Sequence, residues 1–284
     1  MLIQEAARRG LALSDDGIAC QVIDAHAHLG RCPDIHAAHG DAEGMLASMD
    51  RIGIRTTCVS SFQALGGDYC RGNEAVADVV RRYPSRFMGY AVINPNYPDD
   101  IEREISRCLD DLRLFAVKLH PTYHGMPPDA PAYHRVYTMM QVRRGVILSH
   151  TFGDPGTLER LAAGYPDATF IEAHTAATYT PRVAVSYAVV MAARPNIYLD
   201  MCLSRVTYGD LEQWVDAVGA DRLLFGTDVP FNDNAHQIGR VTHAAISEAD
   251  KRAILGGNMM RIVGGGVKST VRSPKSSVVS SRHD

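Results

Sequence analysis

Short apolar runs alternate with longer amphipathic stretches along most of the chain. Each short run is rich in Val, Ile, Leu and Phe and is bounded by turn-forming or charged residues, which is typical of a buried strand. Eight such runs are present. The predicted strands are Val22–Leu29, Thr57–Ser61, Phe87–Ile93, Phe115–His120, Val146–His150, Thr169–His174, Ile197–Leu203 and Leu223–Asp228.

Between the predicted strands, apolar residues recur at the spacing of a helix that buries one face. Asn73 and Ser247 predict two helix starts, because their side chains accept hydrogen bonds from free backbone N–H groups. The predicted helices are Ala42–Ile52, Asn73–Tyr83, Asp99–Leu112, Ala132–Arg144, Gly156–Tyr165, Pro181–Arg194, Asp210–Val218, Asn234–Ile246 and Glu248–Ile262.

Regular alternation of strand and helix predicts parallel strands with helices packed outside them. Eight repeats favour a single α/β domain, a (β/α)8 TIM-like barrel over residues 22–263. An open doubly wound sheet is the alternative, but the first strand carries Ala25-His26-Ala27-His28 and no glycine-rich phosphate turn follows it. Residues 1–21 form an N-terminal extension, and the Gly-, Ser- and Lys-rich composition of residues 264–284 predicts a flexible tail.

Composition narrows the class of protein. Hydrophobic residues make up 46% of the chain and charged residues 21%, as in globular proteins with a large core. The net charge of −3 leaves no basic field for nucleic acid, and no apolar run reaches the roughly 18 residues of a membrane span. No signal-peptide pattern precedes the first strand, and the six cysteines form no CxxC pair. We therefore expect reduced thiols and a cytoplasmic protein.

Polar side chains close four of the predicted strands. His26 and His28 end the first strand, and His150, His174 and Asp228 end the fifth, sixth and eighth. The carboxyl ends of barrel strands converge on one face, where catalytic residues sit. Burying so many polar groups without partners would be unfavourable, and a metal ion satisfies them. Imidazole and carboxylate ligands suit zinc and similar ions, which lower the pKa of bound water to about 7.

Several short sequence motifs of the chain resemble those of a known family. Four segments carry the resemblance: Ile23–His28, Val117–Pro121, Leu224–Pro230 and Ile254–Asn258. Together with the polar strand ends, they resemble the amidohydrolase superfamily, and more narrowly its amidohydrolase 2 branch. That branch includes lactone and amide hydrolases as well as zinc-dependent decarboxylases of unsaturated or aromatic acids. The resemblance spans about residues 22–263.

The resemblance implies roles for the strand-end residues. His26, His28 and His150 are expected to be metal ligands, and Asp228 a ligand, a base or both. His174 is expected to polarise the substrate or help to activate water. We expect one divalent ion, zinc in the first instance, with Mn²⁺ as an alternative. A second alternative is a two-metal site bridged by carboxylated Lys118.

Further side chains are expected around the mouth of the barrel. Lys118 and His120 lie two residues apart on one predicted strand, and Arg31 and Tyr123 lie in loops that follow strands. We interpret these four as substrate-binding residues, because a positive mouth suits a carboxylated substrate. His124 and Arg205 are expected near the same mouth.

Three functions remain open from the sequence. The first is hydrolysis of an amide, lactone or related bond of a small substrate, with Asp228 and His174 managing protons. The alternative is non-oxidative decarboxylation on the same site, and the third is an inactive binding barrel. No GxSxG or GxxxxGK[ST] motif is present, which argues against serine-hydrolase and P-loop chemistry. We expect a small-molecule substrate, no nucleic-acid or membrane partner, and a homodimer.

Overall fold

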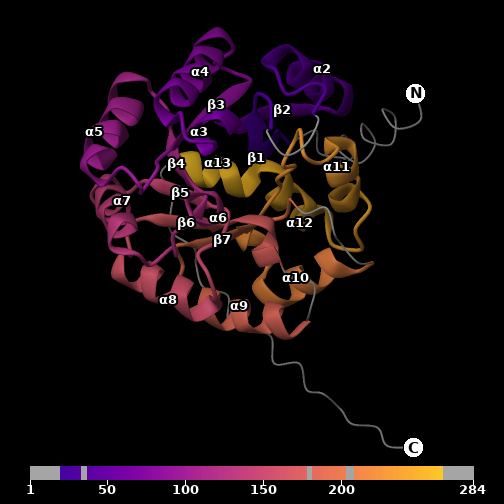
Figure 1. Ribbon diagram of the computed structural model, residues 1–284. Coiled ribbons are helices and arrows are strands. Elements are labelled where there is room, and N and C mark those ends of the chain that lie inside the picture. Colours follow the sequence, from indigo (N-terminus) through magenta and orange to yellow (C-terminus); the bar gives the residue numbers. More distant parts are fainter. Residues whose placement is uncertain (1–19, 33–36, 178–180, 203–207, 265–284) are drawn as a thin grey trace, which may run out of the picture.

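The computed structural model describes residues 20–32, 37–177, 181–202 and 208–264, and its strands form one parallel sheet (Figure 1). The eight strands follow one another in sequence order around the sheet. Apart from residues 20, 21 and 264, the predicted extension and tail lie outside the described residues. The strands are β1 Val22–Leu29, β2 Ile54–Ser61, β3 Phe87–Val92, β4 Ala116–Leu119, β5 Val146–Ser149, β6 Thr169–Glu172, β7 Ile197–Asp200 and β8 Leu223–Leu224.

The sheet closes through the segment that follows β8. The backbone N–H of Ala25 donates to the Phe225 carbonyl at 2.8 Å, and that of His28 donates to the Val229 carbonyl at 2.7 Å. Ala27 and Val229 also form a parallel bridge. The predicted TIM-like barrel is therefore confirmed, although its last strand is shorter than Leu223–Asp228.

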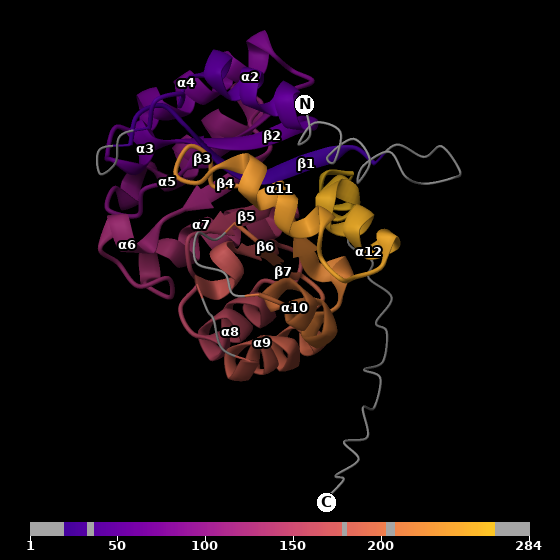
Figure 2. The same ribbon diagram turned by 90° about the vertical axis from the view of Figure 1, so that its right-hand side faces the viewer.

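Helices surround the strands in Figures 1 and 2, as expected for buried parallel strands. Short 3₁₀ and π turns extend several of them. Among the described residues, no helix is long and apolar enough to cross a membrane. The α-helices are α2 Ala42–Ile52, α3 Phe62–Leu65, α4 Tyr69–Arg82, α5 Ile101–Ser106, α6 Pro121–His124, α7 Pro131–Arg143, α8 Pro155–Gly164, α9 Pro181–Ala193, α10 Asp210–Val218, α11 Asn234–Thr242, α12 Glu248–Arg252 and α13 Asn258–Val263.

One predicted helix start is confirmed and another is wrong. Ser247 caps α12 by accepting a hydrogen bond from the Asp250 backbone N–H. Asn73, in contrast, lies inside α4, which begins after Asp68. The Asn73 amide is fully buried and donates to the Val92 carbonyl and to Glu104. It therefore joins the helix to the barrel instead of capping it.

The predicted helix Glu248–Ile262 is interrupted by a π turn, Ala253–Gly257. At Gly256 the chain passes so close to β1 that a Cβ atom would lie 1.9 Å from the Gln21 carbonyl oxygen. After this turn, Met259 and Ile262 of α13 pack into the inner core of the barrel. The helix therefore closes the barrel at the amino-terminal end of its strands.

Candidate metal centre

A β-bulge in β1 orients the two histidines of the HxH motif. Asp24 pairs with Thr57 and Ala27 with Val59, so β1 advances three residues where β2 advances two. The His26 backbone N–H donates to Asp24 Oδ1 at 3.1 Å across this bulge. As a result, the Nε2 atoms of His26 and His28 lie 3.2 Å apart.

Asp228 reaches the same point from the other side of the barrel closure. Its Oδ1 lies 3.1 Å from His28 Nε2 and 3.7 Å from His26 Nε2. The Asp228 backbone is left-handed, with φ 58°, an unusual conformation for a residue with a side chain. The structure thus brings together three predicted ligands whose ligating atoms all lie within 4.8 Å of one another.

Lys118 is completely buried beside these residues. Its Nζ donates a hydrogen bond to His26 Nε2 at 2.6 Å. Burial lowers the pKa of the Lys118 ammonium to about 8, against the opposing charges of Asp200 and Asp228. A positive group therefore already stands where the histidine and aspartate atoms converge.

The protonation of these groups fits a divalent cation. Burial lowers the pKa of His28 to about 3 and also lowers that of His26, so both rings are neutral at pH 7. Burial opposes ionisation of Asp228, but its hydrogen bond with His28 and the nearby imidazoles hold its pKa below the usual range. Metal ligands need these deprotonated forms. Atoms bound 2.0–2.2 Å from one ion lie roughly 3 Å apart, which matches the His26–His28 separation.

The other two predicted histidines form a second pair. His150 Nδ1 lies 3.1 Å from His174 Nε2, and the His150 ring stacks on His120 with centroids 4.1 Å apart. His174 does not end a strand but lies in a 3₁₀ turn, Ala173–Ala177, after β6. Two groups of potential ligands among the described residues have ligating atoms within 4.8 Å of one another, and His150 belongs to neither group. Its role as a ligand therefore stays a prediction.

Two site residues were missed in the sequence. Asp200 and Cys202 are fully buried and lie with His26 and His174 in a second cluster of metal-binding groups. Asp200 Oδ2 accepts a hydrogen bond from His26 Nδ1 at 2.7 Å. Because Asp200 ends β7, it carries the signal that singled out His150 and Asp228, a polar residue closing an apolar strand.

Aromatic rings flank the metal-binding residues. Phe62 stacks on His28 with centroids 4.5 Å apart, and the partly exposed Phe231 lies 5.2 Å from Phe62. The exposed Tyr123 ring lies 4.3 Å from His120. The site therefore combines a polar centre with planar apolar surfaces.

The other residues expected at the mouth of the barrel differ in where the structure places them. Arg31 is exposed in the loop after β1. His124 is only 6% exposed, and its Nδ1 hydrogen bonds with the Tyr133 hydroxyl of α7, so it does not line the mouth as expected. Packing under α7 accounts for this burial. Arg205 lies outside the described residues.

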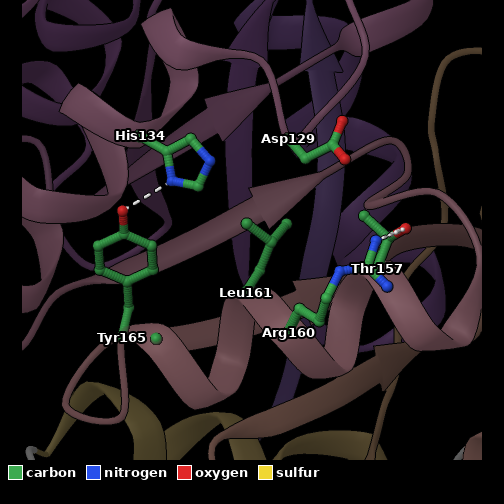
Figure 3. A pocket seen from close by; sticks show the side chains of 7 residues that line it. Asp129, His134, Thr157, Arg160, Leu161 and Tyr165 are labelled. Carbon is green, nitrogen blue, oxygen red and sulfur yellow. Dashed lines mark hydrogen bonds between the residues drawn. The ribbon is translucent and has the colours of Figure 1, made fainter.

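A separate cavity of about 410 Å³ lies between α7 and α8 (Figure 3). Within it, His134 Nδ1 hydrogen bonds with the Tyr165 hydroxyl at 2.7 Å. The lining contains no member of the two metal-binding clusters, so the cavity is distinct from the metal centre. It is lined by Asp129, His134, Thr157, Arg160, Leu161, Gly164 and Tyr165.

Comparison with known proteins places this geometry in context. The family model Amidohydro_2, described as amidohydrolase, matches residues 23–265. A gamma-resorcylate decarboxylase from Polaromonas sp. is 24% identical over 282 residues, covering 75% of this chain and 84% of that protein.

Solved structures show the same fold. The 5-carboxyvanillate decarboxylase of Sphingomonas paucimobilis superposes with a TM-score of 0.72 at 15% identity, covering 87% of this chain and 99% of that one. A dihydroxybenzoic acid decarboxylase from Polaromonas sp., with bound manganese and the inhibitor 2-nitroresorcinol, has a TM-score of 0.66 at 18% identity and covers 86% and 97% of the two chains.

Proposed function

This chain belongs to the amidohydrolase family, and from that premise we propose that it is a metal-dependent decarboxylase of a small hydroxylated aromatic acid. The observation that carries the proposal is the buried cluster of His26, His28 and Asp228 beside a buried lysine. Two neutral imidazoles and a carboxylate that converge on one point are a ligand set suited to a divalent ion. The similarity to decarboxylases supports this reaction over hydrolysis.

The flanking rings support an aromatic substrate. Phe231 and Tyr123 are both partly exposed and lie against residues of the site. Such rings stack on a planar substrate and exclude water around it. The Lys118 ammonium lies within the same site and suits a substrate carboxylate or phenolate.

The chemistry divides among named residues. His26, His28 and Asp228 would hold one divalent ion, with His150 as the predicted fourth ligand. When bound, the ion supplies a Lewis acid that orients the substrate oxygens and stabilises negative charge. His174 Nδ1–H donates to the Cys202 carbonyl at 2.8 Å, so His174 in its imidazolium form would deliver the Nε2 proton to the ring carbon that bears the carboxylate. The bond from that carbon to the carboxylate then breaks, its electron pair returns to the ring, and carbon dioxide leaves.

Hydrolysis, the first expectation from the sequence, is the second candidate. Both histidines of the first strand are retained, whereas some related decarboxylases replace part of this pair with Glu. An amide or lactone hydrolase would use the same His26–His28–Asp228 cluster. The two reactions differ in product, since only decarboxylation releases carbon dioxide.

The test compares metal-loaded and chelator-stripped protein. Both are incubated in D₂O with 2,6-dihydroxybenzoate, 5-carboxyvanillate and a panel of lactones and cyclic amides. We expect carbon dioxide release from a hydroxylated aromatic acid, with one deuterium at the carbon that carried the carboxylate, and only from loaded protein. Reconstitution with Mn²⁺ and with Zn²⁺ in parallel identifies the active ion.

The opposite results are equally clear. Ring-opened product from a lactone or cyclic amide, with no carbon dioxide from any acid, would replace decarboxylation with hydrolysis. If the protein takes up neither ion when supplied with it, the third hypothesis, a catalytically inactive binding barrel, would be favoured instead.

A further inference from the structure

Asp200 contacts the ring of His26, a predicted metal ligand, and the backbone of His174 in the 3₁₀ turn Ala173–Ala177. We propose that Asp200 is a positioning residue that sets the tautomer of His26 and so presents His26 Nε2 to the metal. The inference rests on the proposed metal centre. It does not depend on whether the reaction is decarboxylation or hydrolysis.

The two nitrogens of the His26 ring face different partners. Asp200 Oδ2 lies 2.7 Å from His26 Nδ1, and an ionised carboxylate only accepts hydrogen bonds, so Nδ1 carries the proton. On the opposite side, the Lys118 ammonium donates to Nε2 at 2.6 Å, so Nε2 carries a lone pair. The two contacts select the same tautomer.

Cys202 reinforces this assignment. Its Sγ lies 3.0 Å from His26 Nδ1, but the thiol hydrogen is directed to Asp200 Oδ1 at 2.7 Å. The sulfur is then a weak acceptor toward Nδ1, which again requires a proton on Nδ1. Nε2, which carries the lone pair, lies 3.2 Å from His28 Nε2 and 3.7 Å from Asp228 Oδ1.

The Asp200 carboxylate is itself held in one orientation. Its Oδ1 accepts backbone N–H groups from His174 at 3.0 Å and from Cys202 at 3.1 Å. Asp200 is fully buried, so its Oδ2 is shielded from solvent where it accepts from His26 Nδ1. The same carboxylate also holds the His174 backbone in its left-handed conformation, with φ 60°.

A carboxylate behind a ligating histidine raises the basicity of the ring and fixes its direction. Removing such a partner typically lowers metal affinity by roughly 10- to 100-fold. Asp200 would therefore act on the metal through His26 without touching it.

Asp200→Asn gives the sharpest test. The two backbone N–H groups keep the amide oxygen at the Oδ1 position, so the amide NH₂ faces His26 Nδ1. His26 then accepts at Nδ1 and carries its proton on Nε2, where Lys118 can no longer donate, and this is the wrong tautomer for ligation. In metal-free protein, long-range ¹H–¹⁵N NMR of labelled histidine should show Nδ1–H for His26 in the wild type and Nε2–H in the variant. The Kd for Mn²⁺ should rise about 10- to 100-fold.

Glu172→Gln is the matched control. Glu172 is 1% exposed and also ends a strand, but its carboxylate accepts from the Phe152 backbone N–H and not from an imidazole. The control should keep both the wild-type His26 tautomer and the wild-type Mn²⁺ affinity. Asp200→Ala removes the acceptor without supplying a donor and leaves Lys118 donating to Nε2, so it should keep the Nδ1–H tautomer and lose less affinity than Asp200→Asn.

Two results would overturn the proposal. One is a wild-type His26 that carries its proton on Nε2, a measurement that needs no variant to fold. The other is a folded Asp200→Asn protein whose Mn²⁺ affinity stays within twofold of the wild type. Both readouts are made without substrate, so an error in the proposed reaction leaves them unaffected.

Discussion

Asp24 and Thr227 lie 203 residues apart in the chain, yet the Thr227 hydroxyl donates a hydrogen bond to Asp24 Oδ2 at 2.6 Å. Asp24 Oδ1 also accepts the backbone N–H groups of His26 and Thr227, at 3.1 and 3.0 Å. One buried carboxylate thus joins the bulge that bears the HxH pair to the turn that bears Asp228. The relative position of the predicted ligands depends on this link.

Replacement of Thr227 by Val should therefore weaken both the fold and the metal centre. The change removes the donor to Asp24 and the acceptor of the Val229 backbone N–H, which are buried or partly buried. A loss of about 1–3 kcal/mol in the free energy of unfolding is expected. Urea denaturation and Mn²⁺ titration measure the two effects. Thr56→Val, at an exposed hydroxyl that donates to Ser85, should change stability by no more than about 0.5 kcal/mol.

A methyl group at Gly256 should destabilise the barrel. A Cβ there would lie 1.9 Å from the Gln21 carbonyl oxygen, so α13 or β1 must shift. Gly256→Ala is expected to lower the free energy of unfolding by roughly 1–3 kcal/mol or more. Gly239→Ala, in α11, meets no atom within 4 Å and should instead be neutral or stabilising by up to about 1 kcal/mol. Equal melting temperatures for the two variants would contradict the close approach.

The buried acid Glu172 predicts a dependence of stability on pH. Burial raises its pKa to about 8 from 4.5, although hydrogen bonds from Phe152 and Thr151 oppose the shift. Because the folded-state pKa is raised, its contribution to stability is complete below about pH 4.5 and is lost as the pH rises through about 8. In metal-free protein, Glu172→Gln should gain stability relative to the wild type across this window. The free energy of unfolding is measured for both proteins from pH 5 to 8. A difference between them that stays constant with pH would rule out the raised pKa of Glu172.

Removal of the Phe231 ring should affect substrate binding more than the metal. The ring is 37% exposed and lies 5.2 Å from Phe62, which stacks on His28. If it packs on an aromatic substrate, Phe231→Ala should raise KM about 3- to 10-fold, as expected for one stacked pair. Metal content should not change. Tyr208→Ala, at a fully exposed ring, serves as the control. An unchanged KM for Phe231→Ala would contradict stacking of Phe231 on the substrate.

The sequence alone was sufficient to predict the barrel and the convergence of His26, His28 and Asp228. The eight strands are short apolar runs whose pattern is local, so residues such as Val146–Ser149 identify themselves wherever they occur. The alternation of side chains along a strand likewise predicted that His26 and His28 would reach one point, and their Nε2 atoms lie 3.2 Å apart.

Only the tertiary structure decided how these parts meet. The β-bulge at Asp24–Ala27, the link from Asp24 to Thr227 and the hydrogen bond from His26 to Asp200 each join segments that are distant in the chain. The burial of Asn73 and the π turn at Gly256 arise in the same way, from packing against a neighbouring strand. Local sequence patterns do not predict such contacts, because the hydrogen-bond partner of a buried polar group depends on which distant segments the fold brings close to it.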